Sequence, residues 1–226
     1  MASWMVHLRI AEKLSLMIND ISEREFVIGN IAPDSGVPNE DWSKFDPPYE
    51  VSHYIVTDGN GERRRDVAAF VSEYLSDEII DGYTPDRFSF YLGYLAHLIT
   101  DDLWIERVIK YCAEKFPDDY AADKKAAIWR WKKDFYDLDA KYLRDNPEFH
   151  AFNLYASSVG VENKYLEFFS RDAFDNRREY ITRFYLEERD DLDREYAFFT
   201  EEEMNSFVEN APDEILKRLN SFVKKL

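Results

Sequence analysis

The residues best able to do chemistry in this chain are histidines and the aspartates near them. Only four histidines occur, His7, His53, His97 and His150, and three of them lie in the first 100 residues. Asp101 follows His97 by four positions, so on a helix both side chains project from the same face, one turn apart. A carboxylate on an apolar stripe is costly to bury unless a cation compensates its charge. Imidazole with carboxylate suits zinc, iron or manganese, so we expect a divalent metal site.

The proline-rich segment before this helix supplies two further candidates, Asp34 and His53. If both bind the same ion as His97 and Asp101, the metal ties down a loop that has little core of its own. His7 then contributes from the first helix, either as a fifth ligand or to a second ion bridged by Asp101. The predicted metal ligands are His7, Asp34, His53, His97 and Asp101.

Each candidate also has a plainer interpretation. His7 alone is typical of a packed histidine, Asp34 of a turn residue and His53 of a loop residue. His97 and Asp101 could form a hydrogen-bonded pair within a helix. His150 has no histidine or carboxylate one turn downstream, and we interpret it as structural.

Residues around the candidate ligands allow similar alternatives. Tyr54, Trp42 and Trp104 could line a substrate pocket, although we expect Trp104 to belong to the core. Asp102 and Glu106 could accept hydrogen bonds from ligating imidazoles, but we expect ordinary acids on a helix surface.

The elements that must position these residues are predicted to be helices. The chain has 226 residues, of which 45% are hydrophobic, and only 7 Gly and 8 Pro. Such sparing use of turn residues favours helices over many short strands. Apolar periodicity predicts helices at residues 4–20, 63–76, 85–116, 119–144, 149–158, 161–187, 200–209 and 212–224, with a short helix from Ser22 towards Ile31 and a long irregular segment over 32–62. Thr200 and Glu203 form a capping box, and Pro212 is expected near the start of the last helix.

The predicted fold is an all-α, multi-helix single domain over residues 1–226. Residues 1–116 are expected to form the metal-binding core and residues 117–226 a helical C-terminal half.

Composition also limits the function classes. The net charge of −17, from 46 acidic and 29 basic residues, disfavours binding to nucleic acid and to anionic lipid surfaces. Cys112 is the only cysteine, so no intrachain disulfide can form, which suits a reducing compartment. The amphipathic opening lacks the features of a signal peptide, and no apolar run has membrane-spanning length. We therefore expect a cytoplasmic protein without a transmembrane segment.

Four fragments carry a resemblance to a known family: His7-Leu8-Arg9-Ile10-Ala11, Gly29-Asn30-Ile31-Ala32-Pro33-Asp34, Ser52-His53-Tyr54, and Tyr94-Leu95-Ala96-His97-Leu98-Ile99-Thr100-Asp101. In this order they resemble the zinc-dependent phospholipase C and related nuclease superfamily, which is all-helical. The resemblance covers about the first 110 residues. It implies that Asp34, His53, His97 and Asp101 bind one zinc ion, and that Asp101 bridges to a neighbouring ion held by His7.

The chain also departs from that family. Secreted phospholipases of the family use the amino group of an N-terminal Trp as a ligand, whereas Trp4 is internal here. Arg107 stands where the family has another His, and the later His-x3-Glu is absent because Leu154 follows His150 by four residues. We therefore expect one or two ions, with zinc as the metal.

The resemblance and the ligand set together predict a metal-dependent hydrolase. Its substrate is expected to be a small or lipid-derived phosphoester, its nucleophile a metal-activated water, and Asp34 both a ligand and a proton acceptor. The alternative is a helical scaffold or binding protein with a structural or vestigial metal site. The sequence carries no indication of the oligomeric state.

Overall fold

The computed structural model describes residues 1–41 and 43–224. The chain is an all-α, multi-helix single domain, which confirms the predicted fold class. Its helices are α1 (Trp4–Met17), α2 (Glu23–Ile31), α3 (Tyr49–Ser52), α4 (Val67–Tyr74), α5 (Asp77–Ile80), α6 (Pro85–Trp104), α7 (Lys110–Lys115), α8 (Pro117–Ala122), α9 (Lys124–Asp145), α10 (His150–Ser157), α11 (Ala173–Leu186) and α12 (Glu201–Phe222). A 3-10 turn, η1 (Ala32–Asp34), follows α2, and a π-helical segment, η2 (Ile105–Ile109), joins α6 to α7.

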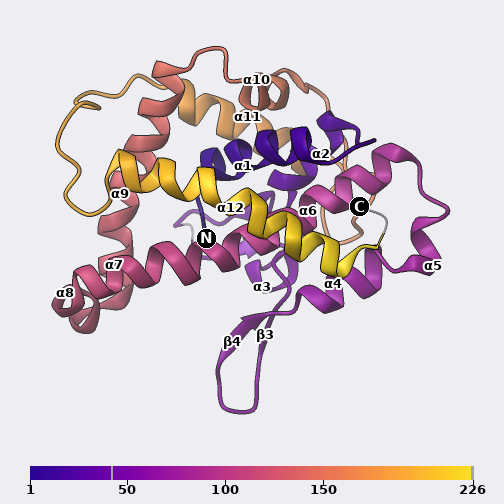
Figure 1. Cartoon of the computed structure of the whole chain (residues 1–226), viewed down its shortest axis with the longest axis horizontal. Coiled ribbons are helices and arrows are strands. Elements are labelled where there is room, and N and C mark those ends of the chain that lie inside the picture. Colours follow the sequence, from indigo (N-terminus) through magenta and orange to yellow (C-terminus); the bar gives the residue numbers. More distant parts are fainter. Residues whose placement is uncertain (42, 225–226) are drawn as a thin grey trace.

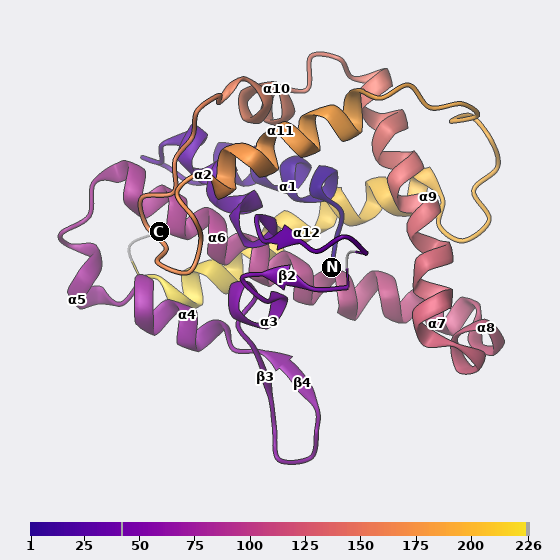
Figure 2. The same ribbon diagram turned by 180° about the vertical axis from the view of Figure 1, so that it is seen from behind.

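Two helices form the centre of the molecule. Every residue of α6 from Ser89 to Asp101 is buried, and α1 is buried around its whole circumference from Met5 to Ala11. A helix that is buried on all sides must be surrounded by other elements. Figure 1 shows α1, α2 and α12 lying against α6, and Figure 2 shows α10 and α11 above them from behind. The C-terminal helices therefore cover the N-terminal ones and do not form a separate body.

The segment predicted as a long irregular loop contains short elements. Strand β1 (Val37–Pro38) pairs antiparallel with β2 (Phe45–Asp46), and β3 (Ile55–Thr57) pairs antiparallel with β4 (Arg63–Arg65). The β3–β4 hairpin projects from the helical body in both views (Figures 1 and 2). The predicted helix over 63–76 was wrong at its start, because residues 63–65 pair with β3. Helix α4 begins only after Asp66, whose side chain accepts the Ala69 amide.

Two other predicted boundaries were wrong. Residues 161–172 are not helical, because the Asn163 side chain hydrogen-bonds the backbone of residues 165, 166 and 169 and competes with a helix. The helices predicted at 200–209 and 212–224 are one helix, α12, with Pro212 inside it. A proline within a helix costs about 3 kcal/mol, but both sides of Pro212 bury one continuous apolar stripe. The capping box of Thr200 and Glu203 is confirmed.

Candidate metal centre

The centre is positioned by unusually close packing of α2 against α6. A Cβ on Gly29 would lie 2.0 Å from the Phe90 carbonyl oxygen, and one on Gly93 would lie 2.1 Å from the Phe26 carbonyl oxygen. Only glycine at both positions allows the two backbones to touch in this way. His97 lies one turn after Gly93 on the same face of α6, so its imidazole is set against the end of α2.

This packing fixes the orientation and tautomer of His97. Its Nδ1 lies 2.7 Å from the Asn30 carbonyl oxygen. A carbonyl can only accept, so Nδ1 carries the proton and donates it, and Nε2 is left with its lone pair. Burial lowers the pKa of His97 well below its usual value, and the neighbouring His7 lowers it further. A neutral imidazole with one free nitrogen is the form that binds a metal.

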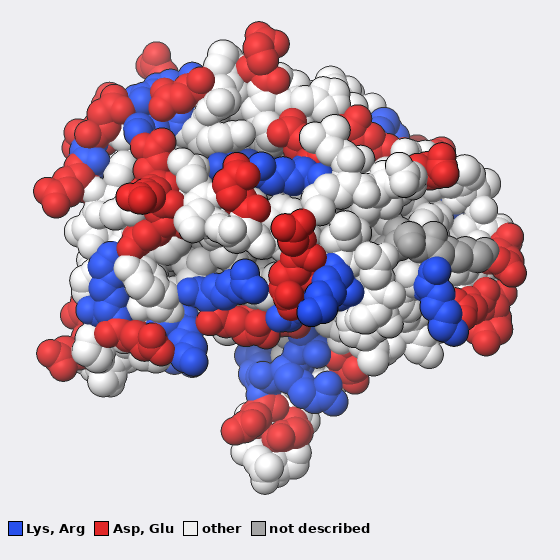
Figure 3. Space-filling model, viewed as in Figure 1, with Lys and Arg blue, Asp and Glu red and all other residues white. Residues whose placement is uncertain are grey.

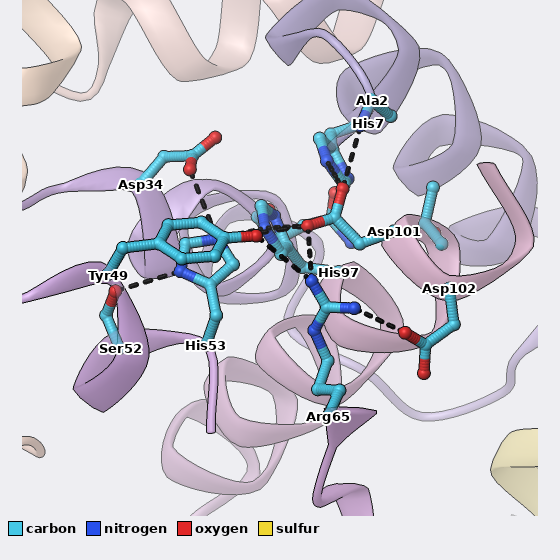
Figure 4. Close-up of polar contacts among 12 residues, drawn as sticks. Ala2, His7, Asp34, Tyr49, Ser52, His53, Arg65, His97, Asp101 and Asp102 are labelled. Carbon is cyan, nitrogen blue, oxygen red and sulfur yellow. Dashed lines mark hydrogen bonds and ion pairs between the residues drawn. The ribbon is translucent and has the colours of Figure 1, made fainter. Parts of the chain in front are cut away.

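His53 and Asp34 meet that free nitrogen. His53 directly follows α3, and its Nε2 lies 3.3 Å from His97 Nε2 and 3.3 Å from Asp34 Oδ1. Its other ring nitrogen is hydrogen-bonded to Ser52 Oγ at 2.9 Å. In tetrahedral zinc sites with ligand bonds of about 2.0–2.1 Å, neighbouring ligand atoms lie about 3.3–3.4 Å apart. The two pairs that His53 makes therefore have a spacing that a tetrahedral metal ion could occupy (Figure 4).

Asp101 lies at the edge of this group. Its Oδ2 is 3.8 Å from His97 Nε2 and 3.9 Å from His53 Nε2. Its Oδ1 accepts the Ala2 amide at 2.8 Å and lies 3.4 Å from His7 Nε2. The imidazole of His7 is stacked on that of His97, with ring centroids 3.8 Å apart. The structure thus brings all five sequence-predicted residues into one cluster.

Two sets of three residues in the cluster could hold an ion: Asp34, His53 and His97, or His7, His97 and Asp101. Both sets include His97. Because His97 Nδ1 is occupied by Asn30, both sets need the same Nε2 atom, and one nitrogen lone pair serves one ion. The two sets therefore compete.

Polar atoms without partners mark where a cation fits. Asp34 Oδ2 and both ring nitrogens of His7 are buried without a hydrogen-bond partner among the described residues. Buried polar groups of this kind are rare unless a water or an ion satisfies them. The unpartnered polar atoms and the distances between the ligand atoms therefore both fit a divalent cation.

The surroundings of the two carboxylates in the cluster favour their ionised form. Burial alone raises the pKa of Asp34, but the hydrogen bond with His53, with a further electrostatic contribution from the neighbouring imidazoles, outweighs it and holds the pKa below its usual value. Burial also opposes ionisation of Asp101, yet the nearby amino group of Met1, the contact with His7 and the charge of Arg65 hold its pKa well below the usual range. Both groups are therefore available as anionic ligands.

The cluster is almost closed to solvent. The side chains of His7, His97 and Asp101 are 0% exposed, and that of Asp34 is 8% exposed. A cavity of about 30 Å³, lined by Asp34, His53 and Tyr49 among others, adjoins it. That volume corresponds to about one water molecule.

Sequence reasoning missed Arg65 and Tyr49. Arg65, from β4, donates to Asp101 Oδ2 at 2.9 Å and to the Tyr49 hydroxyl at 3.1 Å. The Tyr49 ring is stacked on His53 with centroids 3.8 Å apart. The run Arg63-Arg64-Arg65 beside a glycine-containing turn was a usable signal, because it is the one place in the sequence where three basic residues are consecutive.

Other expectations can now be compared with the structure. Trp104 is fully buried in the core, as expected. Tyr54 donates to Glu73 and packs edge-on against Phe70, and it is not among the residues around the centre. His150 lies on the surface, 3.1 Å from Glu23. Trp42 lies outside the described residues.

The two acids of α6 and η2 differ from the expectation in one respect. Asp102 is half-buried and accepts a hydrogen bond from Arg65, so it was wrong to treat it as an ordinary surface acid. Glu106 does lie on the surface, where it pairs with Arg218 at 3.0 Å.

Comparisons with family models, with curated proteins and with solved structures found no match to this chain. Within residues 1–41 and 43–224, no helix has both the length and the apolar character needed to cross a membrane.

Proposed function

We propose that this protein is a zinc-dependent phosphoester hydrolase. The observation that supports this most is the spacing of His53 Nε2, His97 Nε2 and Asp34 Oδ1, at 3.3 Å for the two measured pairs, beside a water-sized cavity. Three protein ligands with room for one water is the pattern of catalytic zinc sites. The resemblance of the first 110 residues to zinc-dependent phospholipases supports a phosphoester as the substrate class.

A divalent ion, when bound, lowers the pKa of a bound water molecule and acts as an electrophile towards a phosphoryl oxygen. The residues of the chain do the rest. Asn30 and Ser52 orient the two ligating imidazoles, and Asp34 offers a second, unpartnered oxygen towards the cavity. That Oδ2 atom can accept a hydrogen bond from a water held there and orient it. The closed surroundings exclude bulk water and strengthen each electrostatic contact.

A second candidate is favoured by one observation, the nearly complete burial of the cluster. Structural zinc sites are closed, with every coordination position filled by protein. In that case Asp101 approaches as the fourth ligand and the ion stabilises a helical scaffold or binding protein.

Turnover and zinc content together distinguish the two functions. The zinc-loaded protein should hydrolyse a generic phosphomonoester or phosphodiester, and His97→Ala should lose at least 100-fold in rate along with its zinc. His150→Ala, which changes a surface histidine, should match the wild type. One zinc per chain without turnover on either ester would instead establish the structural site.

A further inference from the structure

The start of α9 carries a group of lysines around an exposed tryptophan. Residues 124–133 include five basic residues and no acidic one. Trp129 is 58% exposed, and the ammonium group of Lys132 lies 4.8 Å from the centre of its ring. A cavity of about 330 Å³ opens on this side of the helix, and the described residues that line it are Lys124, Lys125, Ile128, Trp129 and Lys132. We call these five residues, together with Lys133 one turn after Trp129, the lysine face.

The same side of α9 is covered by protein further along the helix. Spacings of three and four residues place Tyr136 and Asp139 on the side of Lys132. There, α11 covers the helix, because Tyr136 packs edge-on against Phe184 and Tyr185 donates a hydrogen bond to Asp139. In Figures 1 and 2, α11 approaches α9 towards the end of α9 that is farther from α8. The lysine face is therefore the part of this side that α11 leaves uncovered.

The charges of this region are mostly unpaired. Among the described residues, Arg130 is the one cation of the five that forms an ion pair, with Asp119 at 3.1 Å. The Asp123 side chain is used to accept the Ala126 amide. Residues 117–133 contain five basic and three acidic residues, so they are locally positive in a chain of net charge −17. On the side of the molecule seen in Figure 3, by contrast, basic side chains mostly lie beside acidic ones.

The inner edge of the lysine face borders the candidate metal centre. Burial lowers the pKa of Lys132, while the carboxylates of Asp34 and Asp101 act in the opposite direction. Lys132 in turn helps to lower the pKa of the Met1 amino group, and Met1 lines the small cavity beside Asp34. The charge of Lys132 is therefore partly offset by the centre, and the other three lysines carry the positive charge of the face.

This combination of side chains matches the surface of an anionic bilayer. Tryptophan prefers the headgroup region of a membrane, where its ring meets both apolar and polar surroundings. Lysines lay their apolar stems along such a surface and keep their ammonium groups at the anionic headgroups. Helices that lie on membranes combine the same residue types, with apolar side chains between cations.

The acidity of the whole chain does not prevent this contact. At physiological ionic strength the Debye length is about 8 Å, so the charges within that distance of the bilayer dominate. The start of α9 lies beside α8 at a corner of the molecule (Figures 1 and 2), and a plane can touch a corner alone. A nucleic acid fits less well, because residues 124–132 span only about 12 Å of helix and a longer polyanion meets the acidic remainder of the surface.

We propose that the lysine face docks the protein on a bilayer surface containing anionic phospholipids, with Trp129 at the level of the headgroups. The lysines supply the attraction and the indole ring supplies the apolar contact. The inference goes beyond the proposed function and does not require bound zinc.

The test is cosedimentation of the full chain, without added zinc, with vesicles of phosphatidylcholine alone or with about 30% phosphatidylserine. The wild type should bind the mixed vesicles at least tenfold more tightly than the neutral ones. Each lysine near an anionic leaflet strengthens binding by about fivefold. Lys124→Gln combined with Lys125→Gln should therefore weaken binding to mixed vesicles at least tenfold, and Trp129→Ala should weaken it about fivefold or more.

The controls change side chains of the same kinds elsewhere. Lys164→Gln combined with Lys217→Gln removes two exposed lysines from other elements, and Leu16→Ala removes an apolar side chain that is 84% exposed. Both controls should bind within twofold of the wild type.

Three results would overturn the inference. They are equal or absent binding of the wild type to the two kinds of vesicle, wild-type affinity in the variants of the lysine face, and tighter binding to a single-stranded oligonucleotide than to the mixed vesicles. The last result would assign the face to nucleic acid. Zinc content and turnover are measured separately, so each of these results leaves the proposed function intact.

Discussion

Replacing His53 should abolish the stabilisation of the protein by zinc. His53 Nε2 lies 3.3 Å from both His97 Nε2 and Asp34 Oδ1, so it is central to the three-residue set. At a zinc concentration 100-fold above Kd, a ligand that binds only the native state adds about 2.7 kcal/mol. With an unfolding entropy of about 2.1 cal/mol/K per residue over 226 residues, that free energy raises Tm by about 6 °C.

The assay is thermal unfolding of each variant with zinc and after treatment with a chelator. Comparing each variant with itself removes the intrinsic cost of the substitution. His53→Ala should shift by less than about 1 °C on this scale, whereas the wild type and His150→Ala should both shift by the full amount. His150 is a suitable control because its side chain is 60% exposed and pairs only with Glu23 among the described contacts. A full shift in His53→Ala, or none in the wild type, would refute the assigned ligands.

Three further substitutions test the packing, a buried acid and the number of ions. Gly93→Ala should destabilise the protein by about 3 kcal/mol or more in urea unfolding, because the new Cβ would clash with the Phe26 carbonyl. The control Gly59→Ala should be nearly neutral, because no described atom lies within 4 Å of its Cβ. Burial raises the pKa of Asp139 to about 7. The folded state therefore holds a proton that the unfolded state releases above about pH 4, so the stability of the wild type falls as the pH rises to 7. The stability gained by Asp139→Asn should be about 3 kcal/mol larger at pH 8 than at pH 5. An equal gain at both pH values would contradict this. His7→Ala should retain one zinc per chain by elemental analysis, and loss of that zinc would place His7 among its ligands.

The local part of the candidate site could be predicted from the sequence. Four-residue spacing places His97 and Asp101 on one helical face whatever the tertiary structure is, and the apolar stripe around them indicated burial. The positions of Asp34 and His53 could not be predicted in the same way, because no local pattern determines which part of the fold a proline-rich segment contacts. The structure brings them together through η1 and α3, which hold Asp34 and His53 at the ends of short elements.

The part that sequence reasoning could not reach depends on tertiary contacts. Arg65 contacts Asp101 only because β4 pairs with β3. The sequence pattern of residues 63–76 predicted a helix and so gave no sign of this strand pairing. Similarly, the role of Asn30 comes from its backbone carbonyl, which any residue carries. Gly29 and Gly93 make that contact possible, but each has meaning only once α2 and α6 are known to be neighbours.

The central claim is that His53, His97 and an aspartate bind one common ion. X-ray absorption at the zinc edge tests this when the zinc-loaded wild type is compared with His53→Ala, because the competing set of His7, His97 and Asp101 also has two imidazoles and should keep both in that variant. We predict nitrogen and oxygen ligands at about 2.0–2.1 Å with the scattering signature of two imidazoles. A spectrum with oxygen ligands alone, or with a single imidazole, would contradict it.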